Sequence, residues 1–311
     1  MCETRGMTDL GKHYYWIPSG AVRVTGSDRI PFVHGQSTND VRGLPTPGAQ
    51  RALILNAKGQ IEFDVQVFKR TDDLYLQTAL GMGSQVLERL KRYVVFDDVQ
   101  LEDITDKIRV VHLTGEAMLE VAARLGFDLD GPNVQQLRTE IDATLLTAKI
   151  DRGLGIGLDI HVLASKADTL QQWLEIMELT QLENLEQARI LAGIPDAHAD
   201  HFLGMLPQET GLEFAISYKK GCYIGQEIMA RLEARGHTNR SLARIHSNEK
   251  LEAGTELKLE DRTVGSVGTS VQHDGRWVSL AVVRKEVEDG AALVALDQTV
   301  KLERLDKTAR A

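Results

Sequence analysis

The sequence predicts an α+β protein built from two ferredoxin-like α/β lobes and a small C-terminal β-barrel. Two observations indicate the lobes: amphipathic helices and alternating strands occur in mixed order, and a similar order follows a second time. A third indicates the barrel, because beyond Gly236 the helical period disappears and short alternating stretches replace it. A chain of 311 residues has room for two or three packed domains.

The first lobe is expected to have the order βαβββαβ. Residues 21–25 (AVRVT) alternate as a half-buried strand does, and an N-cap candidate at Ser27 or Asp28 precedes a short apolar helix face. The turns NAKG and TDD separate further strands. The predicted elements are strand 21–25, helix 28–34, strands 51–56, 61–69 and 74–78, helix 84–93 and strand 99–104.

The second lobe shows a weaker βαββα order, followed by two helices and then the barrel stretches LARIHS, TVGSVG and WVSLAVV. The predicted elements are strand 108–113, helix 116–125, strands 144–150 and 158–163, and helices 169–178, 185–192 and 226–234. We therefore divide the chain into a region 1–235, with lobes at about 1–105 and 106–235, and a barrel domain 236–311.

Composition and charge exclude several classes of protein. A net charge of −9 and a pI near 5.5 disfavour stable nucleic-acid binding. The longest apolar runs fall far short of the roughly 20 residues that cross a bilayer, and no signal-peptide pattern opens the chain, so we expect no membrane association and a cytoplasmic location. Cys2 and Cys222 are the only cysteines, so a disulfide framework or a metal site made by this chain alone is not expected.

The segment YKKGCYIGQE, residues 218–227, concentrates chemically useful groups just before a predicted helix. Gly221 and Gly225 permit backbone conformations closed to other residues, and the helix start forms a partly positive end. Lys219, Lys220 and that helix start favour the thiolate of Cys222. The alternative is that Cys222 is a small buried apolar residue.

The string KGCYIGQE resembles the signature of the YgfZ family, relatives of the glycine cleavage system T-protein, the tetrahydrofolate-dependent aminomethyltransferase. Further strings match in the family's order and spacing: PFVHGQSTNDV at 31–41, LNAKGQIEFDV at 55–65, RILAGIP at 189–195 and LPQETGL at 206–212. The resemblance implies a T-protein-like folate-binding fold with tetrahydrofolate or a one-carbon derivative at its centre. It also implies a role in keeping iron–sulfur enzymes active, including those that modify tRNA.

The resemblance assigns roles to individual residues. Asp64 matches a carboxylate that faces the folate and the transferred one-carbon unit, whereas Phe63 replaces the adjacent acid of the transferases. Asp159 falls where relatives hold the pterin through a glutamate, and a carboxylate can accept two hydrogen bonds from the donor edge of a pterin. Arg189 opens the segment that matches RLEAG, where it either assists the folate or ties the lobes together.

The signature segment itself is expected to supply both catalysis and folate contacts. Cys222 and Asp64 are the expected catalytic residues. The expected folate-binding residues in this segment are Lys220, Tyr223, Gln226, Glu227 and Arg231, although Glu227 and Arg231, four apart on a helix, can also form an ordinary exposed ion pair.

Other polar segments carry less weight. Gln36, Thr38 and Asn39 are expected to form a turn at the edge of the site. The histidines and acids of PDAHADHF, residues 195–202, are interpreted as a solvated loop rather than as metal ligands. GLGIG, residues 153–157, leads into a strand and therefore lacks the geometry of a dinucleotide loop.

Three hypotheses for function remain at this point. The first is a folate-binding protein that supports assembly or repair of iron–sulfur clusters in client enzymes, with those clients or assembly proteins as its partners. The second is a folate-dependent aminomethyl or one-carbon transferase. The third is a non-catalytic interaction module with a degenerate folate cavity.

Overall fold

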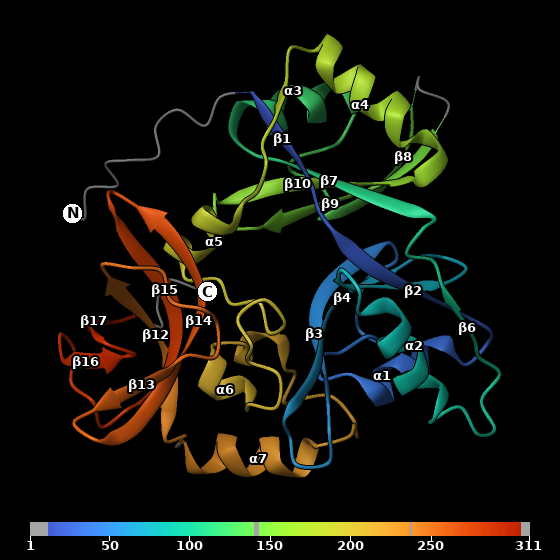
Figure 1. Ribbon diagram of the computed structural model, residues 1–311. Helices are drawn as coiled ribbons and strands as arrows, with labels where there is room; N and C mark the ends of the chain where they lie inside the picture. The colour runs from blue at the N-terminus through green and yellow to red at the C-terminus, as the bar shows by residue number, and fades with distance from the viewer. Residues whose placement is uncertain (1–11, 140–142, 237, 306–311) are drawn as a thin grey trace.

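Two β-sheets and a closed β-barrel make up the protein, and they surround a central segment that touches all three (Figure 1). The computed structural model describes residues 12–139, 143–236 and 238–305. Cys2 and the C-terminal residues 306–311 lie outside the described part. The predicted fold class, α+β with a C-terminal barrel, is confirmed.

The first sheet has five strands, and apolar side chains on one of its faces pack under two helices. Val22, Val65 and Val67 belong to this core, together with Phe32 of the first helix and Val86 of the second. Since successive strand residues point to opposite faces, the alternate positions face the centre of the protein. The strand order is β3 (Gly48–Leu55), β4 (Ile61–Lys69), β5 (Leu74–Ala79), β2 (Ser19–Thr25) and β6 (Gln100–Asp103), with helices α1 (Arg29–Gln36) and α2 (Gly83–Lys91).

The second sheet has six strands, and one of them precedes all strands of the first sheet in the sequence. That strand, β1, pairs with β7 and β11. The sequence patterns did not predict it, because four residues are too few to show a period. Strand β8 was missed as well. The order is β11 (Thr180–Gln181), β1 (His13–Trp16), β7 (Ile108–Leu113), β10 (Ile156–Leu163), β9 (Ala143–Asp151) and β8 (Val134–Thr139), with α3 (Gly115–Leu125), η1 (Ala164–Lys166) and α4 (Ala167–Ile176).

A linking segment of short helices runs from the second sheet, past the first, to the barrel. It contains α5 (Glu186–Ala192), α6 (Pro207–Thr210), η2 (Glu213–Ala215) and α7 (Gln226–Arg235). The barrel follows, and the pairing of β12 with β17 closes it. Its strands are β12 (Arg240–Ser247), β13 (Glu256–Leu259), β14 (Arg262–His273), β15 (Arg276–Arg284), β16 (Ala292–Ala295) and β17 (Gln298–Arg304).

Separate apolar clusters hold the three parts together. Phe68 and Tyr75 of the first sheet pack with Leu146 of the second. Ile190 of α5 and Phe202 pack against the outer face of barrel strands β12 and β15. Because these contacts are buried and apolar, they stabilise one arrangement of the three parts. Among the described residues, no helix combines the length and the apolar character that a membrane span requires.

Candidate functional site

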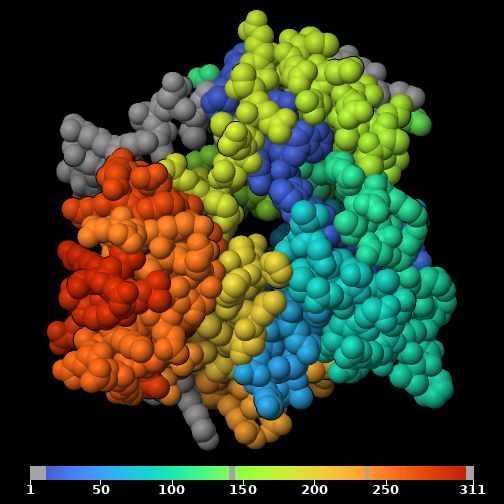
Figure 2. Space-filling view, in the orientation of Figure 1, coloured from blue at the N-terminus to red at the C-terminus, as the bar shows by residue number. Residues whose placement is uncertain are grey.

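A cavity of about 630 Å³ lies where the two sheets meet the linking segment. The space-filling view shows the molecule hollowed at this junction (Figure 2). Strands β2 to β5 form one wall, the end of β9 and the start of β10 form another, and residues 189–214 close the third side. The cavity is therefore built from segments far apart in the sequence.

The first sheet presents a polar patch to this cavity because its strands alternate. On β4, Val65 and Val67 point into the core beneath the helices, whereas Asp64 and Gln66 line the cavity. On the neighbouring β5, Gln77 lines the cavity too. A strand that is apolar on one face and polar on the other, yet has both faces covered, indicates a ligand site rather than a solvent face.

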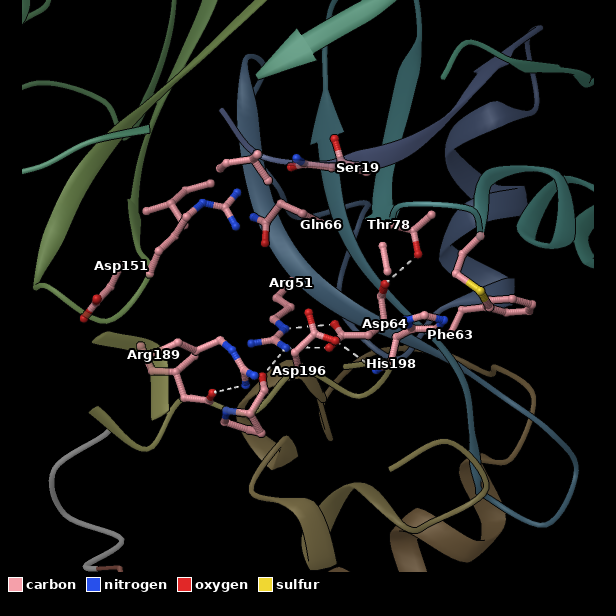
Figure 3. A pocket seen from close by; sticks show the side chains of 18 of the residues that line it. Ser19, Arg51, Phe63, Asp64, Gln66, Thr78, Asp151, Arg189, Asp196 and His198 are labelled. Carbon is pink, nitrogen blue, oxygen red and sulfur yellow. Dashed lines mark hydrogen bonds and ion pairs between the residues drawn. The ribbon is translucent and has the colours of Figure 1, made fainter. Parts of the chain in front are cut away.

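Arg51 of β3 and Asp64 of β4 form the central ion pair of the cavity (Figure 3). The guanidinium donates from Nε to Oδ1 at 2.8 Å and from Nη2 to Oδ2 at 2.5 Å. It also donates to the carbonyl of Pro195 at 2.6 Å, and it lies 5.5 Å from the ring centroid of Phe214. Both oxygens of the expected catalytic acid are therefore engaged by an arginine.

Asp196 holds an accessible carboxylate oxygen at the cavity, close to Arg51 and Asp64 (Figure 3). Its Oδ1 accepts the backbone N–H groups of His198 and Ala199 at 2.9 and 2.8 Å, whereas its Oδ2 has no hydrogen-bond partner among the described residues. Burial acts to raise the pKa of Asp196, but those backbone N–H groups and the nearby arginines lower it below its ordinary value. The free oxygen is thus a charged acceptor.

This placement corrects the interpretation of PDAHADHF as a solvated loop. Asp196 and His198 line the cavity, and Asp200 is fully buried. Asp200 accepts two hydrogen bonds from Arg189, at 2.8 and 3.1 Å, and further ones from the backbone of Asp196 and of Thr269 in β14. Among the described residues, no three histidine, cysteine or acidic side chains gather as metal ligands.

Arg189 lines the cavity and is paired with Asp200, which in turn accepts a hydrogen bond from barrel strand β14. Besides Asp200, its guanidinium contacts Glu186 and the carbonyl of Ile194. Burial acts to lower the pKa of Arg189, but the charge of Asp200 and the hydrogen bonds with Glu186 and Asp200 raise it above its ordinary value. Its position at the cavity allows the ligand role expected of it, whereas its hydrogen bonds lie within the linking segment rather than between the lobes.

Asp159 lies behind the cavity wall rather than on it. Its side chain is 0% exposed, and Arg152, which does line the cavity, donates to both of its oxygens at 3.1 and 2.5 Å. His112 Nδ1 lies 2.7 Å from Oδ1 and donates to it, since a carboxylate can only accept. Burial acts to raise the pKa of Asp159, but Arg152 and His112 together hold it well below its usual range.

The signature segment lies outside the cavity wall. Lys220 is buried and donates from Nζ to the carbonyl of His34, in the last turn of α1, and to those of Ser37 and Asn39, which follow its end. Those carbonyls lack intrahelical partners, so the lysine caps the helix. Burial lowers the pKa of Lys220 to about 8. Its ammonium also lies 4.7 Å from the ring centroid of Tyr223.

The remaining residues of the segment have mixed environments. Cys222 is exposed, which excludes the alternative of a small buried residue. Tyr223 belongs to the apolar cluster that joins β3 and β4 to α7. Glu227 and Arg231 form the exposed ion pair that their spacing allows. Neither these residues nor Gln226 line the central cavity.

A second cavity of about 680 Å³ lies between the linking segment and the barrel. Phe214 lines both cavities and is half-exposed. The two cavities therefore share an aromatic side chain that also contacts Arg51.

Several cavity residues were not anticipated from the sequence: Arg51, Gln66, Gln77, Arg152 and Asp196. A signal existed for the strand residues, because IEFDVQV is polar at every second position although both faces of the strand are covered. No local pattern marks Arg152 or Asp196.

The three-part architecture, with a polar cavity between the two sheets and the linking segment, defines an aminomethyltransferase-type fold. The structure resembles that of glycine cleavage system aminomethyltransferase T from Bartonella henselae, with a TM-score of 0.78, 15% sequence identity, and coverage of 95% of this chain and 86% of that chain. The model of the GCVT N-terminal domain matches residues 18–220. The chain therefore belongs to the GCVT N-terminal domain family.

Two relatives refine this assignment within the family. The tRNA-modifying protein YgfZ of Yersinia enterocolitica is 30% identical over 230 residues, covering 71% of this chain and 66% of that protein, just under two thirds. The protein of the same name from Yersinia pestis is 26% identical over 294 residues, covering 90% and 86%. The resemblance predicted from the sequence motifs is confirmed.

Proposed function

We propose that this protein binds tetrahydrofolate or a one-carbon derivative in the central cavity. We further propose that it thereby supports assembly or repair of iron–sulfur clusters in client enzymes of the cytoplasm, including tRNA-modifying ones. The observation that carries the proposal is the cavity itself, which lies where the two sheets meet the linking segment and has on its wall a charged acceptor with no hydrogen-bond partner among the described residues. Its volume of about 630 Å³ falls within the range of small-molecule sites, roughly 300–1,000 Å³.

The polar groups of the cavity suit the two ends of a folate. A pterin ring carries N–H donors on one edge, and the free oxygen of Asp196 can accept from such an edge. The other end carries carboxylates, which an arginine binds well. Arg152, whose side chain is 26% exposed, is the cation that we assign to that role. Asp159 then acts by positioning Arg152 rather than by touching the folate.

Thermal unfolding with and without tetrahydrofolate tests the binding step. Ligand at 100 times its dissociation constant should stabilise the protein by about 2.7 kcal/mol. The Asp196→Asn variant should reduce this shift, because its amide replaces a charged acceptor, whereas the control Glu227→Gln, on the exposed pair outside the cavity, should keep it. No shift in the wild-type protein would refute folate binding and favour the interaction module.

We propose that Cys222 is the residue that acts on the client proteins. Its thiol is exposed and lies outside the cavity wall, so a macromolecule can reach it while the cavity is filled. Support for clients that modify tRNA comes from relatives named tRNA-modifying protein. The surrounding segment is held in place by Lys220, so the thiol has a defined position.

Complementation tests the role of the thiol. In a host that lacks its own relative, the wild-type chain should restore the tRNA modifications that depend on iron–sulfur enzymes, and Cys222→Ala should not. The matched control is Cys2→Ala, which removes the only other cysteine. Since Cys222 is exposed, its replacement should leave the unfolding temperature unchanged. Full restoration by Cys222→Ala would remove the thiol from the mechanism.

The fold also supports the transferase alternative, because its solved counterpart is an aminomethyltransferase. Against it, Asp64 is engaged through both oxygens by Arg51, and the neighbouring position is Phe63 instead of a second acid. The oxygens of this acid are thus directed at an arginine rather than at an amine substrate. An assay for methylenetetrahydrofolate formation decides between the two, since turnover would establish the transferase.

A further inference from the structure

Two glutamine side chains face the cavity side by side. Gln66 of β4 and Gln77 of β5 are directly opposite each other in the antiparallel pair, and both line the cavity. Side chains in such pairs have Cβ atoms about 4.5–5.5 Å apart. On the other side, Gln66 is opposite Arg51 of β3. A row of hydrogen-bonding side chains thus crosses three neighbouring strands.

The amides of this pair have no partner within the described part of the protein. Gln77 is only 5% exposed, and its Oε1 is buried without a hydrogen bond. A buried amide without a partner costs free energy, on the order of 1–3 kcal/mol. A group kept in this condition on the wall of a cavity indicates that a bound molecule supplies the partner.

The chemistry of a primary amide narrows the kind of partner. It presents an N–H donor and a C=O acceptor in one plane, and so it can form two hydrogen bonds with a ring edge that carries an acceptor beside a donor. A reduced pterin has such an edge, formed by its ring carbonyl and the adjacent N–H. Carboxylates, at the other end of a folate, only accept and are better served by arginine.

We propose that Gln66 and Gln77 are the specificity-determining residues that recognise the carbonyl and N–H edge of a reduced pterin. The inference rests on the proposed folate binding, and it identifies the residues that form hydrogen bonds with the pterin ring. Because both amides meet one ring edge, the effects of replacing them should not add.

The test compares Gln66→Leu and Gln77→Leu with a control, Gln50→Leu. Gln50 also has a buried, unpartnered amide nitrogen, but it does not line the cavity. Titration calorimetry should show that each cavity variant binds tetrahydrofolate about tenfold more weakly, which corresponds to one neutral hydrogen bond, and that the control binds as the wild type does. Without ligand, Gln77→Leu should unfold at the same or a higher temperature, because leucine removes an unsatisfied group. If Gln77 had only a structural role, its replacement by leucine would lower the unfolding temperature.

A ligand fragment then locates the contact. A reduced pterin without the benzoylglutamate tail should compete with tetrahydrofolate in the wild type, and Gln77→Leu should weaken this competition by a similar factor. Wild-type affinity for tetrahydrofolate in both cavity variants would overturn the inference while leaving folate binding intact. The inference would also be overturned if the reduced pterin competed equally well in the variants, or if it did not compete with tetrahydrofolate in the wild type. Failure of the wild type to bind tetrahydrofolate would instead refute the proposed function.

Discussion

The carboxylate of Asp159 contacts the guanidinium of Arg152 through both oxygens, at 3.1 and 2.5 Å. The acid is fully buried and the arginine lines the central cavity, so the acid holds a cation at the wall without reaching a ligand itself. His112, buried on the neighbouring strand β7, donates to the same carboxylate. The chain from His112 through Asp159 to Arg152 therefore determines where one of the positive charges of the cavity lies.

Replacing Asp159 by asparagine should destabilise the protein and displace Arg152. Removing one member of a buried ion pair costs about 3–5 kcal/mol of stability. Because Arg152 is partly exposed, we expect a loss near the lower end of this range. Urea unfolding measures the effect. The control Glu227→Gln breaks the exposed ion pair with Arg231 and should change the free energy of unfolding by no more than about 0.5 kcal/mol. Equal effects of the two changes would contradict a structural role for Asp159.

Acid should weaken the packing between the two sheets through His161. This side chain is 4% exposed and contacts Tyr75 of the first sheet, with Asp159, Arg152 and Arg70 as its charged neighbours. Burial lowers the pKa of His161 from 6.5 to about 4. Between these values the unfolded chain binds a proton that the folded protein does not, so stability falls as the pH falls through this window.

The size of this effect can be measured by unfolding at pH 7 and pH 5. His161 should account for a loss of about 2 kcal/mol between the two. The glutamine of His161→Gln cannot be protonated in this range. The stability of this variant should therefore fall by about 2 kcal/mol less than that of the wild type between pH 7 and pH 5. Asp159 adds its own loss only below about pH 4, where the unfolded carboxyl becomes protonated. Identical pH profiles for variant and wild type would show that His161 does not titrate as described.

The two glycines of the signature segment should respond differently to alanine. Gly225 has a φ of 85°, and an added Cβ would lie 2.7 Å from the carbonyl oxygen of Asn56. Gly225→Ala should therefore cost at least about 2 kcal/mol. At Gly221 the nearest heavy atom to an added Cβ is 3.8 Å away, so Gly221→Ala should stay within about 0.5 kcal/mol of the wild type. Thermal unfolding of both variants provides the comparison, and equal losses would contradict it.

Lys220→Met should reduce stability rather than ligand affinity. The methionine matches the aliphatic length but leaves three carbonyls near the end of α1 without their donor, which should cost about 2–3 kcal/mol. Lys220→Arg should not retain the wild-type stability either, because a planar guanidinium does not fit a site built around a compact ammonium. Unfolding and tetrahydrofolate titration together separate the roles: a lower affinity with unchanged stability would mean that Lys220 contacts the ligand.

Much of the fold could be predicted from the sequence, because the signals for helices and strands are local. Alternation in IEFDVQV and WVSLAVV and the loss of helical period beyond Gly236 indicated the first lobe and the barrel. Strands β1, β8 and β11 were missed. Strand β1 depends on its partners in the second sheet for its conformation, as four residues carry no period of their own.

The site was predicted less completely. The motifs were enough to place the chain in its family, and they drew attention to Asp64 and Arg189, which do line the cavity. They also drew attention to Lys220 and Asp159, which lie outside its wall, since a motif marks that a residue matters but not which neighbour it meets.

By itself, then, the sequence determined the order of most of the elements, the barrel and the family, since each follows from patterns within a few tens of residues. Only the tertiary structure decided which groups face the cavity: Asp159 is covered by Arg152, Asp196 has one oxygen without a partner among the described residues, and Gln66 stands beside Gln77. The reason is physical. Burial, ion pairing and unsatisfied hydrogen bonds depend on neighbours that the fold brings together from distant parts of the chain.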